Sequence, residues 1–279
     1  MLSILLPVYN KDCTSLVIVL SRQAQALGID HEIVMAEDGS EHVTDYAALG
    51  IPNLRHIVRT EHHGRSAMRN FLFDEACYPL LLMMDCDVSI VATDFVERYL
   101  LAAQTHDVVC GGIVYPDTCP SPQCHLRYDY EKHYERRFTA RRLGKMQQPP
   151  FRSSCFLIHK KVADTVHFDE RFQTYGYEDV LFGKALRQVG FRVHYIDNPV
   201  LNTQVENDDV YWGKVQQSLS TLAEFRDDLR SESSLLRLAE RIASQSFLVC
   251  LLSAVRFFCW TTVARFQWRR LSYLVSILR

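Results

Sequence analysis

Short apolar runs alternate along much of the chain with segments in which apolar positions recur every three or four residues. The short runs predict β-strands at Leu2–Leu6, Glu32–Ala36, Leu54–Val58, Leu80–Met84, Val108–Val114 and Arg192–Ile196. The periodic segments predict helices at Thr14–Leu27, Arg65–Ala76, Asp94–Gln104 and Glu178–Val189. This alternation is typical of an α/β fold whose sheet is mainly parallel.

Two segments depart from this alternation. Residues 115–150 combine turn residues with a charged, aromatic stretch, which predicts an insertion over a cleft that contains one helix. Beyond about residue 208 we expect only helices, and residues 241–279 contain six arginines and no acidic residue. We therefore expect a main α/β domain at residues 1–207 and a helical, arginine-rich extension at residues 208–279.

Composition narrows the classes of protein to be considered. The chain has 279 residues, of which 48% are hydrophobic and 23% charged, so a globular protein is expected. A net charge of −2 gives no electrostatic reason to expect nucleic-acid binding. Nine scattered cysteines are unlike a secreted disulfide framework and favour a cytoplasmic location. Neither a signal peptide nor a membrane span of ~20 apolar residues is expected.

Polar residues stand where several predicted strands end. Asn10 follows the first strand in PVYN, Asp38 the second in EDGS, and Asp85 and Asp87 follow the most apolar strand in MMDCDV. Because ligands bind beyond the carboxyl ends of such strands, we expect these side chains at one edge of the sheet. An isolated Asp-x-Asp is more often a solvated turn. After a buried strand, however, its spacing suits Mg²⁺ or Mn²⁺ completed by diphosphate oxygens.

Two predicted helices begin with charged residues. Arg65 and Arg69 in HHGRSAMRN would favour an anion at a helix N-terminus, although an ordinary exposed first turn is an equal alternative. Glu178 and Asp179 in TYGYEDV follow two aromatic residues and a glycine. These acids either complement the helix dipole or accept a proton from a sugar hydroxyl, while the aromatic rings stack on the sugar.

Taken in order, the segments PVYN, EDGS, GRSAMRN, DCD and FDERFQTYGYEDVLFGKALRQVGFRV resemble a glycosyltransferase of the GT-A fold, similar to family 2. The resemblance runs from Leu2 to about Glu206. It implies an inverting enzyme of the hexosyl- or N-acetylhexosaminyltransferase type, with Mg²⁺ or Mn²⁺ as cofactor. The donor is expected to be a UDP-sugar, the acceptor a saccharide or lipid-linked hydroxyl, and the setting surface polysaccharide synthesis.

The resemblance also implies roles for single residues. Asp87 would bind the metal on the donor diphosphate, and Asp85 would face the ribose or the donor sugar. Asp179 would be the general base, and Glu178 would help to position the acceptor. With Arg65 close by, the pocket for the nucleotide base and ribose would be lined by Pro7, Tyr9, Asn10 and Asp38.

The chain departs from this family pattern at one position. After IDNPV, relatives often carry a histidine that completes the metal site, whereas this chain has Asn202. The amide carbonyl of Asn202 is the donor atom available there. Either the metal is held mostly by Asp87 and the diphosphate, or the affinity for the metal is reduced.

Residues 241–279 place apolar and aromatic residues at helical spacing among the arginines. This pattern predicts a helix on an anionic membrane surface, at the inner face of the membrane. The alternative is a helix that packs on the main domain or in a homodimer contact.

Two other functions compete with sugar transfer. A nucleotidyltransferase would carry a glycine-rich, lysine-bearing loop after the first strand, and PVYNKDC lacks the glycines. A catalytically weak, membrane-associated subunit that binds nucleotide-sugars is supported by Asn202, but the intact Glu178–Asp179 pair argues against it.

Overall fold

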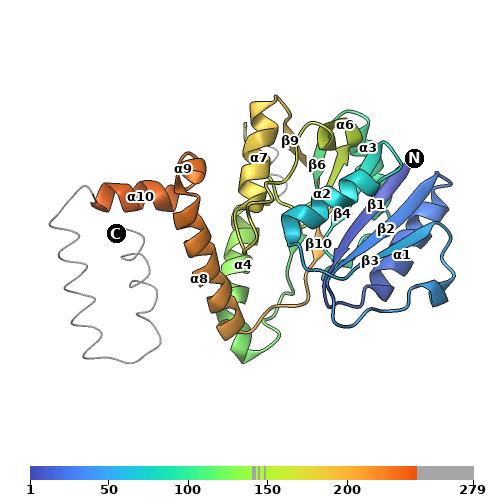
Figure 1. Cartoon of the computed structure of the whole chain (residues 1–279), viewed down its shortest axis with the longest axis horizontal. Coiled ribbons are helices and arrows are strands. Elements are labelled where there is room, and N and C mark those ends of the chain that lie inside the picture. The colour runs from blue at the N-terminus through green and yellow to red at the C-terminus, as the bar shows by residue number, and fades with distance from the viewer. Residues whose placement is uncertain (140–142, 144, 148, 244–279) are drawn as a thin grey trace. The chain divides into compact units, whose positions relative to one another are not determined.

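The computed structural model describes residues 1–139, 143, 145–147 and 149–243 (Figure 1). The chain forms two compact units. Among the described residues, the first comprises residues 1–173 and 178–211, and the second comprises residues 174–177 and 212–243. The boundary after residue 207 stays a prediction. The membrane-binding helix predicted at residues 241–279 lies almost entirely outside the described residues.

The first unit is built on a seven-stranded sheet, as far as its described residues show, with the strand order β3-β2-β1-β4-β8-β6-β9. Every pair is parallel except those that β8 makes with β4 and β6, so the expected mainly parallel sheet is confirmed. The strands are β1 (Leu2–Val8), β2 (His31–Asp38), β3 (Leu54–Arg59), β4 (Leu80–Met84), β6 (Val108–Cys110), β8 (Cys155–His159) and β9 (Val193–Tyr195).

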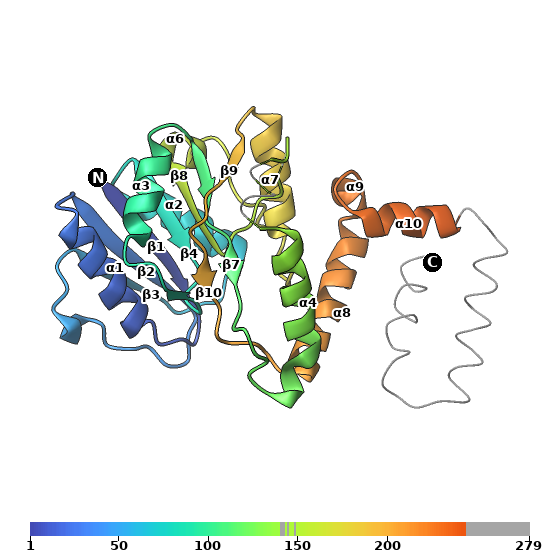
Figure 2. The ribbon, with the colours of Figure 1, turned by 180° about the vertical axis from the view of Figure 1, so that it is seen from behind.

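Helices cover both faces of this sheet (Figures 1 and 2). One face packs against α1 (Thr14–Ala26) and α3 (Phe95–Ala103). The other packs against α2 (Arg65–Glu75), α6 (Lys160–Ala163) and α7 (Glu178–Gln188). Alternate β1 side chains therefore enter different cores, because successive residues of a strand point to opposite faces.

A small second sheet, with the order β5-β10-β7, lies beyond the end of β4. Its strands are β5 (Ser89–Ile90), β7 (Ile113–Val114) and β10 (Val200–Leu201). The single strand predicted at Val108–Val114 is thus wrong, because β6 and β7 are two strands in different sheets. Gly112 between them has a φ of +87°, which favours glycine, and a Cβ at Gly111 would collide with the carbonyl oxygen of Asn198.

Strand β8 was not predicted, although it lies between β4 and β6 and is buried except at its last residue. It brings the chain back into the sheet after the segment 115–150. That segment contains helix α4 (His125–Arg137), preceded by the short 3₁₀ helix η2 (Pro122–Cys124), in agreement with the expected helix. A further 3₁₀ turn, η1 (Ala47–Leu49), connects β2 and β3.

The second unit is helical in its described residues beyond Trp212, as expected. Its helices are most of α8 (Asp208–Glu224), α9 (Arg226–Leu229) and α10 (Ser234–Ala243). The segment 174–177 lies along α8, where the hydroxyl oxygens of Thr174 and Thr221 are 2.8 Å apart. Among the residues that the structure describes, no helix is both long and apolar enough to cross a membrane.

Candidate active site

Asp38, the last residue of β2, anchors the loop that leads into α2. Its Oδ1 accepts a hydrogen bond from the backbone N–H of His63 at 2.7 Å, and its Oδ2 accepts one from Gly64 at 3.0 Å. The Nδ1 atom of the His62 ring also lies 3.0 Å from Oδ2. Only 6% of the Asp38 side chain is exposed, so its carboxylate is committed to positioning this loop.

The loop after β1 lies beside this anchor. Asn10 has a φ of +49° and is fixed from two directions. Its backbone N–H donates to Ser40 Oγ at 2.8 Å, and its Oδ1 accepts from the N–H of Glu41 at the same distance. The half-exposed Tyr9 ring lies 4.8 Å from the His62 ring, measured between centroids. Pro7 is in β1, paired with Ala36 of β2.

The structure thus brings four of the predicted donor-site residues to one edge of the sheet, at the ends of β1 and β2. Tyr9 offers an exposed aromatic face there, whereas Oδ1 of Asn10 and both carboxylate oxygens of Asp38 accept hydrogen bonds from backbone N–H groups. Arg65 follows Gly64 at the start of α2, and its side chain is about half exposed. Tyr9, Asn10 and Arg65 are the members of this group that are exposed to solvent.

Arg69 of α2 contacts the first acid of the Asp-x-Asp motif. Its Nη2 donates to Oδ1 of Asp85 at 3.1 Å, and only 2% of the Arg69 side chain is exposed. Burial raises the pKa of Asp85, Arg69 opposes this shift, and Asp87 adds to it. Asp87 itself is exposed. The motif therefore combines a half-buried acid that is held by arginine with an acid that is open to solvent.

The same arginine reaches the acidic pair at the start of α7. Nη1 of Arg69 lies 3.6 Å from Oε1 of Glu178, and Nη1 of Arg65 lies 3.9 Å from the same oxygen. Glu178 is buried. Within the part of the chain that the structure describes, Nε and Nη1 of Arg69 have no hydrogen-bond acceptor, although both are buried. A buried donor without an acceptor is costly, so this site retains the capacity to bind a further oxygen.

Asp179 carries the clearest electrostatic signature of the site. Burial and the neighbouring Glu178 raise the pKa of Asp179 from 3.8 to about 6, although Arg152 and Arg69 lower it. A carboxylate with this pKa is mostly ionised at neutral pH and is a better proton acceptor than an ordinary aspartate. Asp179 is therefore suited to act as a general base.

The protein-family model described as glycosyl transferase family 2 matches residues 3–166, more than half of the chain. The chain belongs to glycosyl transferase family 2. No curated protein matches this family 2 chain.

Solved structures similar to this family 2 protein share its GT-A fold. TarS 1-349 of S. aureus is 16% identical, with a TM-score of 0.54 over 91% of this chain and 79% of that one. The mannosyltransferase PcManGT from Pyrobaculum calidifontis, in complex with GDP-Man and Mn²⁺, is 14% identical, with a TM-score of 0.54 over 99% and 84%. Glucosyl-3-phosphoglycerate synthase from Mycobacterium tuberculosis, in complex with Mn²⁺, UDP and glucosyl-3-phosphoglycerate, is 15% identical, with a TM-score of 0.52 over 80% of this chain and 78% of that one.

The residues of this family 2 protein fit a divalent cation that substrate oxygens help to hold. The exposed Asp87 offers the carboxylate oxygens that Mg²⁺ and Mn²⁺ favour, next to Asp85, which Arg69 holds. Within the described residues, no group of three or more His, Cys, Asp or Glu side chains could bind a metal by itself. The remaining ligands would therefore come from the diphosphate and from water.

Asn202 stands close to the turn that contains Asp85 and Asp87. It follows β10, whose Leu201 pairs with Ser89 of β5 just after Asp87. Its Oδ1 already accepts a hydrogen bond from the backbone N–H of Gln204 at 2.8 Å. Coordination of a metal by Asn202 would compete with this bond, so its predicted role as a ligand remains a hypothesis.

Sequence reasoning did not assign the two arginines, Arg69 and Arg152, whose charge acts on these acids. Arg69 was named only as a helix-start residue, and the only available signal was its spacing of four from Arg65, which places both on one face of α2. Arg152 lies between the predicted 115–150 insertion and β8. Nothing in the local sequence pattern indicates that it is a neighbour of Asp179.

Proposed function

We propose that this chain is an inverting glycosyltransferase that moves a sugar from a nucleotide-sugar donor to an acceptor hydroxyl. The observation that carries the proposal is the buried Arg69, which holds Asp85 and Glu178 together beside the high-pKa carboxyl of Asp179. The complexes of similar folds with UDP or GDP-Man and Mn²⁺ support a nucleotide-sugar donor. A UDP-sugar and Mg²⁺ or Mn²⁺ are our working assignment.

On the donor side, the exposed ring of Tyr9 would contact the nucleotide base, on a platform that Asn10 and Asp38 hold in place. Asp85 would face the ribose or the donor sugar, fixed by Arg69. Asp87 would bind the divalent cation, which, when present, supplies positive charge to the departing diphosphate.

On the acceptor side, Asp179 would take the proton from the attacking hydroxyl group. The oxygen then forms its bond to the anomeric carbon on the face opposite the leaving group, while the bond from that carbon to the diphosphate oxygen breaks. One substitution of this kind inverts the configuration and needs no covalent enzyme intermediate. Glu178, held between Arg65 and Arg69, would position the acceptor.

We extend the proposal to the cellular setting that the sequence suggests. The reaction would take place on the cytoplasmic side of a membrane, in surface polysaccharide synthesis, with a hexosyl or N-acetylhexosaminyl donor. Residues 241–279 would bind the anionic membrane surface.

Flotation with anionic liposomes tests this role. We expect the full chain to float and a chain that ends near Arg230 to remain behind, and equal flotation would remove the tail from the proposal.

The first test separates donor binding from chemistry. We expect one UDP-, GDP- or dTDP-sugar with Mn²⁺ to raise the melting temperature of the protein. Asp179→Asn should keep this rise but lose about 10³-fold in donor turnover, within the usual range for a general base. Asp94→Asn, a change in an exposed pair with Arg98, is the matched control and should leave both unchanged. Equal loss of binding and turnover in Asp179→Asn would exclude it as the base.

A binding subunit without catalysis is the second candidate, favoured by the occupied amide oxygen of Asn202. It predicts that the wild-type protein shows the donor-induced rise in melting temperature but no turnover of any nucleotide-sugar.

A further inference from the structure

Residues 174–177, which directly precede the acidic pair, belong to the second unit. They cluster with residues 212–243, whereas Glu178 and Asp179 begin α7 in the first unit. A single peptide bond therefore joins a segment that packs on α8 to the two acids of the proposed reaction. The contacts that fix this segment also restrain the point at which α7 begins.

Three residues at helical spacing in α8 lie along one side of the helix, namely Lys214, Ser218 and Thr221. We call them the α8 stripe. Nζ of Lys214 lies 5.1 Å from the centre of the Tyr175 ring, within the range of a cation–π contact. A Cβ atom at Gly176 would lie only 2.9 Å from Cβ of Ser218, so α8 packs directly on the backbone of the segment there.

Thr221 contributes the hydrogen bond of this contact. Only 1% of the residue is exposed. Its hydroxyl oxygen lies 2.8 Å from that of Thr174 and 3.4 Å from the carbonyl oxygen of Tyr175. The carbonyl oxygen of Gln217, one turn earlier in α8, is 3.0 Å away. Whichever hydroxyl donates, the bond between Thr174 and Thr221 joins the segment to α8.

The backbone between these contacts and the acids has an unusual conformation. Gly176 has a φ of +109°, and Tyr177, directly before Glu178, has a φ of +70°. A residue other than glycine in the left-handed region is costly and persists only where the surrounding structure imposes it. The contacts of α8 with Tyr175 and Gly176 provide such a constraint, and this turn leads the chain into α7.

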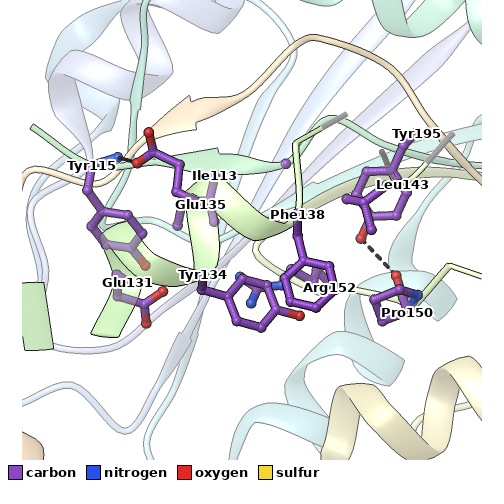
Figure 3. Close-up of a pocket in the computed structure, with 11 residues that line it drawn as sticks. Ile113, Tyr115, Glu131, Tyr134, Glu135, Phe138, Leu143, Pro150, Arg152 and Tyr195 are labelled. Atoms are coloured by element: carbon purple, nitrogen blue, oxygen red, sulfur yellow. Dashed lines mark hydrogen bonds between the residues drawn. The ribbon is translucent and has the colours of Figure 1, made fainter. Parts of the chain in front are cut away.

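The charged groups that act on Asp179 are separate from the α8 stripe. Within the described residues they are Glu178, which raises the pKa of Asp179, and Arg152 and Arg69, which lower it. Arg152 is held within the first unit, where its guanidinium carbon lies 3.7 Å from the centre of the Tyr134 ring (Figure 3). A neutral substitution at Thr221 therefore changes the support of the segment before Asp179 and removes none of these charges.

We propose that the α8 stripe positions the catalytic acids: by holding residues 174–177 it fixes the start of α7, and with it Glu178 and Asp179. This inference rests on the proposed function, because it concerns the acids that the reaction uses. Lys214, Ser218 and Thr221 are positioning residues, since they act through the segment. The helical extension thereby takes part in catalysis, in addition to the membrane role proposed for residues 241–279.

Thr221→Val in the full chain is the direct test, because it removes the hydroxyl group and keeps the size of the side chain. The donor is the UDP-, GDP- or dTDP-sugar that raises the melting temperature with Mn²⁺. We expect kcat for donor turnover to fall about tenfold with the donor KM unchanged, since misplacing a reacting group by about 1 Å can cost up to about 10²-fold. Amide hydrogen exchange, read by mass spectrometry, should become faster in residues 174–182.

Two control variants accompany this test. Thr221→Ser keeps the hydroxyl group and should show wild-type kcat and exchange. Ser220→Ala is the matched control, because the exposed Ser220 hydroxyl donates to the carbonyl oxygen of Gln216 in its own helix at 3.2 Å, and both readouts should stay unchanged. Circular dichroism shows whether each variant is folded. Thr174→Val, which removes the same bond from the exposed segment, repeats the test if Thr221→Val is not folded.

Three results would overturn the positioning role. They are wild-type kcat or wild-type exchange in Thr221→Val, equal changes in Thr221→Val and Ser220→Ala, and a donor affinity that falls as much as kcat does. A wild-type protein that turns over no donor would instead contradict the proposed function. The exchange rates need no reaction, so faster exchange in Thr221→Val than in Ser220→Ala would still show that α8 holds the segment, and equal rates would show that it does not.

Discussion

Two regions at the same edge of the sheet use their carboxylates in different ways. At the ends of β1 and β2, both oxygens of Asp38 accept hydrogen bonds from the backbone N–H groups of His63 and Gly64. At the end of β4 and the start of α7, the acids depend on arginine instead, and Asp85 and Glu178 share the buried Arg69.

The difference distinguishes a region that supports the site, around Asp38, from a region that carries its reactive groups, around Asp85 and Asp179. Two backbone N–H groups satisfy the buried Asp38 carboxylate from fixed positions, with only the exposed His62 ring beside them, so the first region is a rigid support for a ligand. The second region holds more acids than nearby arginines, and the pKa values of Asp85 and Asp179 are raised as a result of burial and like charge. Replacing Asp38 or Asp179 by asparagine should therefore change stability in opposite directions in the two regions.

The largest effect is expected for Arg69→Met. It leaves Asp85 and Glu178 without their shared cation, and breaking a buried pair in this way costs about 3 kcal/mol or more of unfolding free energy. Urea denaturation measures the loss. Arg98→Met, which breaks an exposed pair with Asp94, should have no measurable effect. Similar losses in the two variants would show that Arg69 is not the electrostatic link between the acids.

Asp179→Asn should stabilise the protein at neutral pH. Because the folded pKa of Asp179 is raised to about 6, the folded state binds this proton more tightly than the unfolded chain does. That stabilisation is complete below about pH 4 and is lost as the pH rises through 6, which leaves a cost of about 2–3 kcal/mol at pH 7.5. The variant should exceed the wild type by about this amount at pH 7.5 and by little at pH 4. A difference independent of pH would contradict the raised pKa.

Asp38→Asn is expected to act in the opposite direction. The amide keeps one acceptor oxygen but places an N–H₂ group against a backbone N–H, so one buried hydrogen bond is lost. The expected cost is about 1–2 kcal/mol of unfolding free energy at pH 7.5. Thermal and urea denaturation of Asp38→Asn and Asp179→Asn at the same pH provide the comparison. Stabilisation by both substitutions would remove the distinction between the two regions.

The smallest effect is expected for Asn202→His. An imidazole at this position would add a metal ligand near Asp87, so half-maximal donor turnover should need severalfold less Mn²⁺. Titration of turnover with Mn²⁺ in both proteins measures the change. Superimposable curves would show that position 202 does not bind the metal.

The local pattern of apolar and polar residues was enough to predict most of the strands and helices that position the site. The apolar run at Leu80–Met84 predicted its strand with the observed bounds, and α2 and α7 begin at the predicted residues Arg65 and Glu178. Strand β8 was missed because it follows an irregular insertion, and its antiparallel place in the sheet depends on distant partners. Where β6 ends and β7 begins is decided by the close approach of Asn198 to Gly111 and by the positive φ of Gly112.

The same division holds for the site. Sequence order and residue type alone placed Asp38, Asp85 and Asp179 near the ends of strands or the start of a helix, because strand direction sends those ends to one edge. Only the tertiary structure showed that the oxygens of Asp38 are already occupied, that Arg69 links two acidic motifs, and that Arg152 lies near Asp179. A hydrophobic pattern reports which face of an element is buried. The partner of a buried charge is selected by packing between segments that are far apart in the chain.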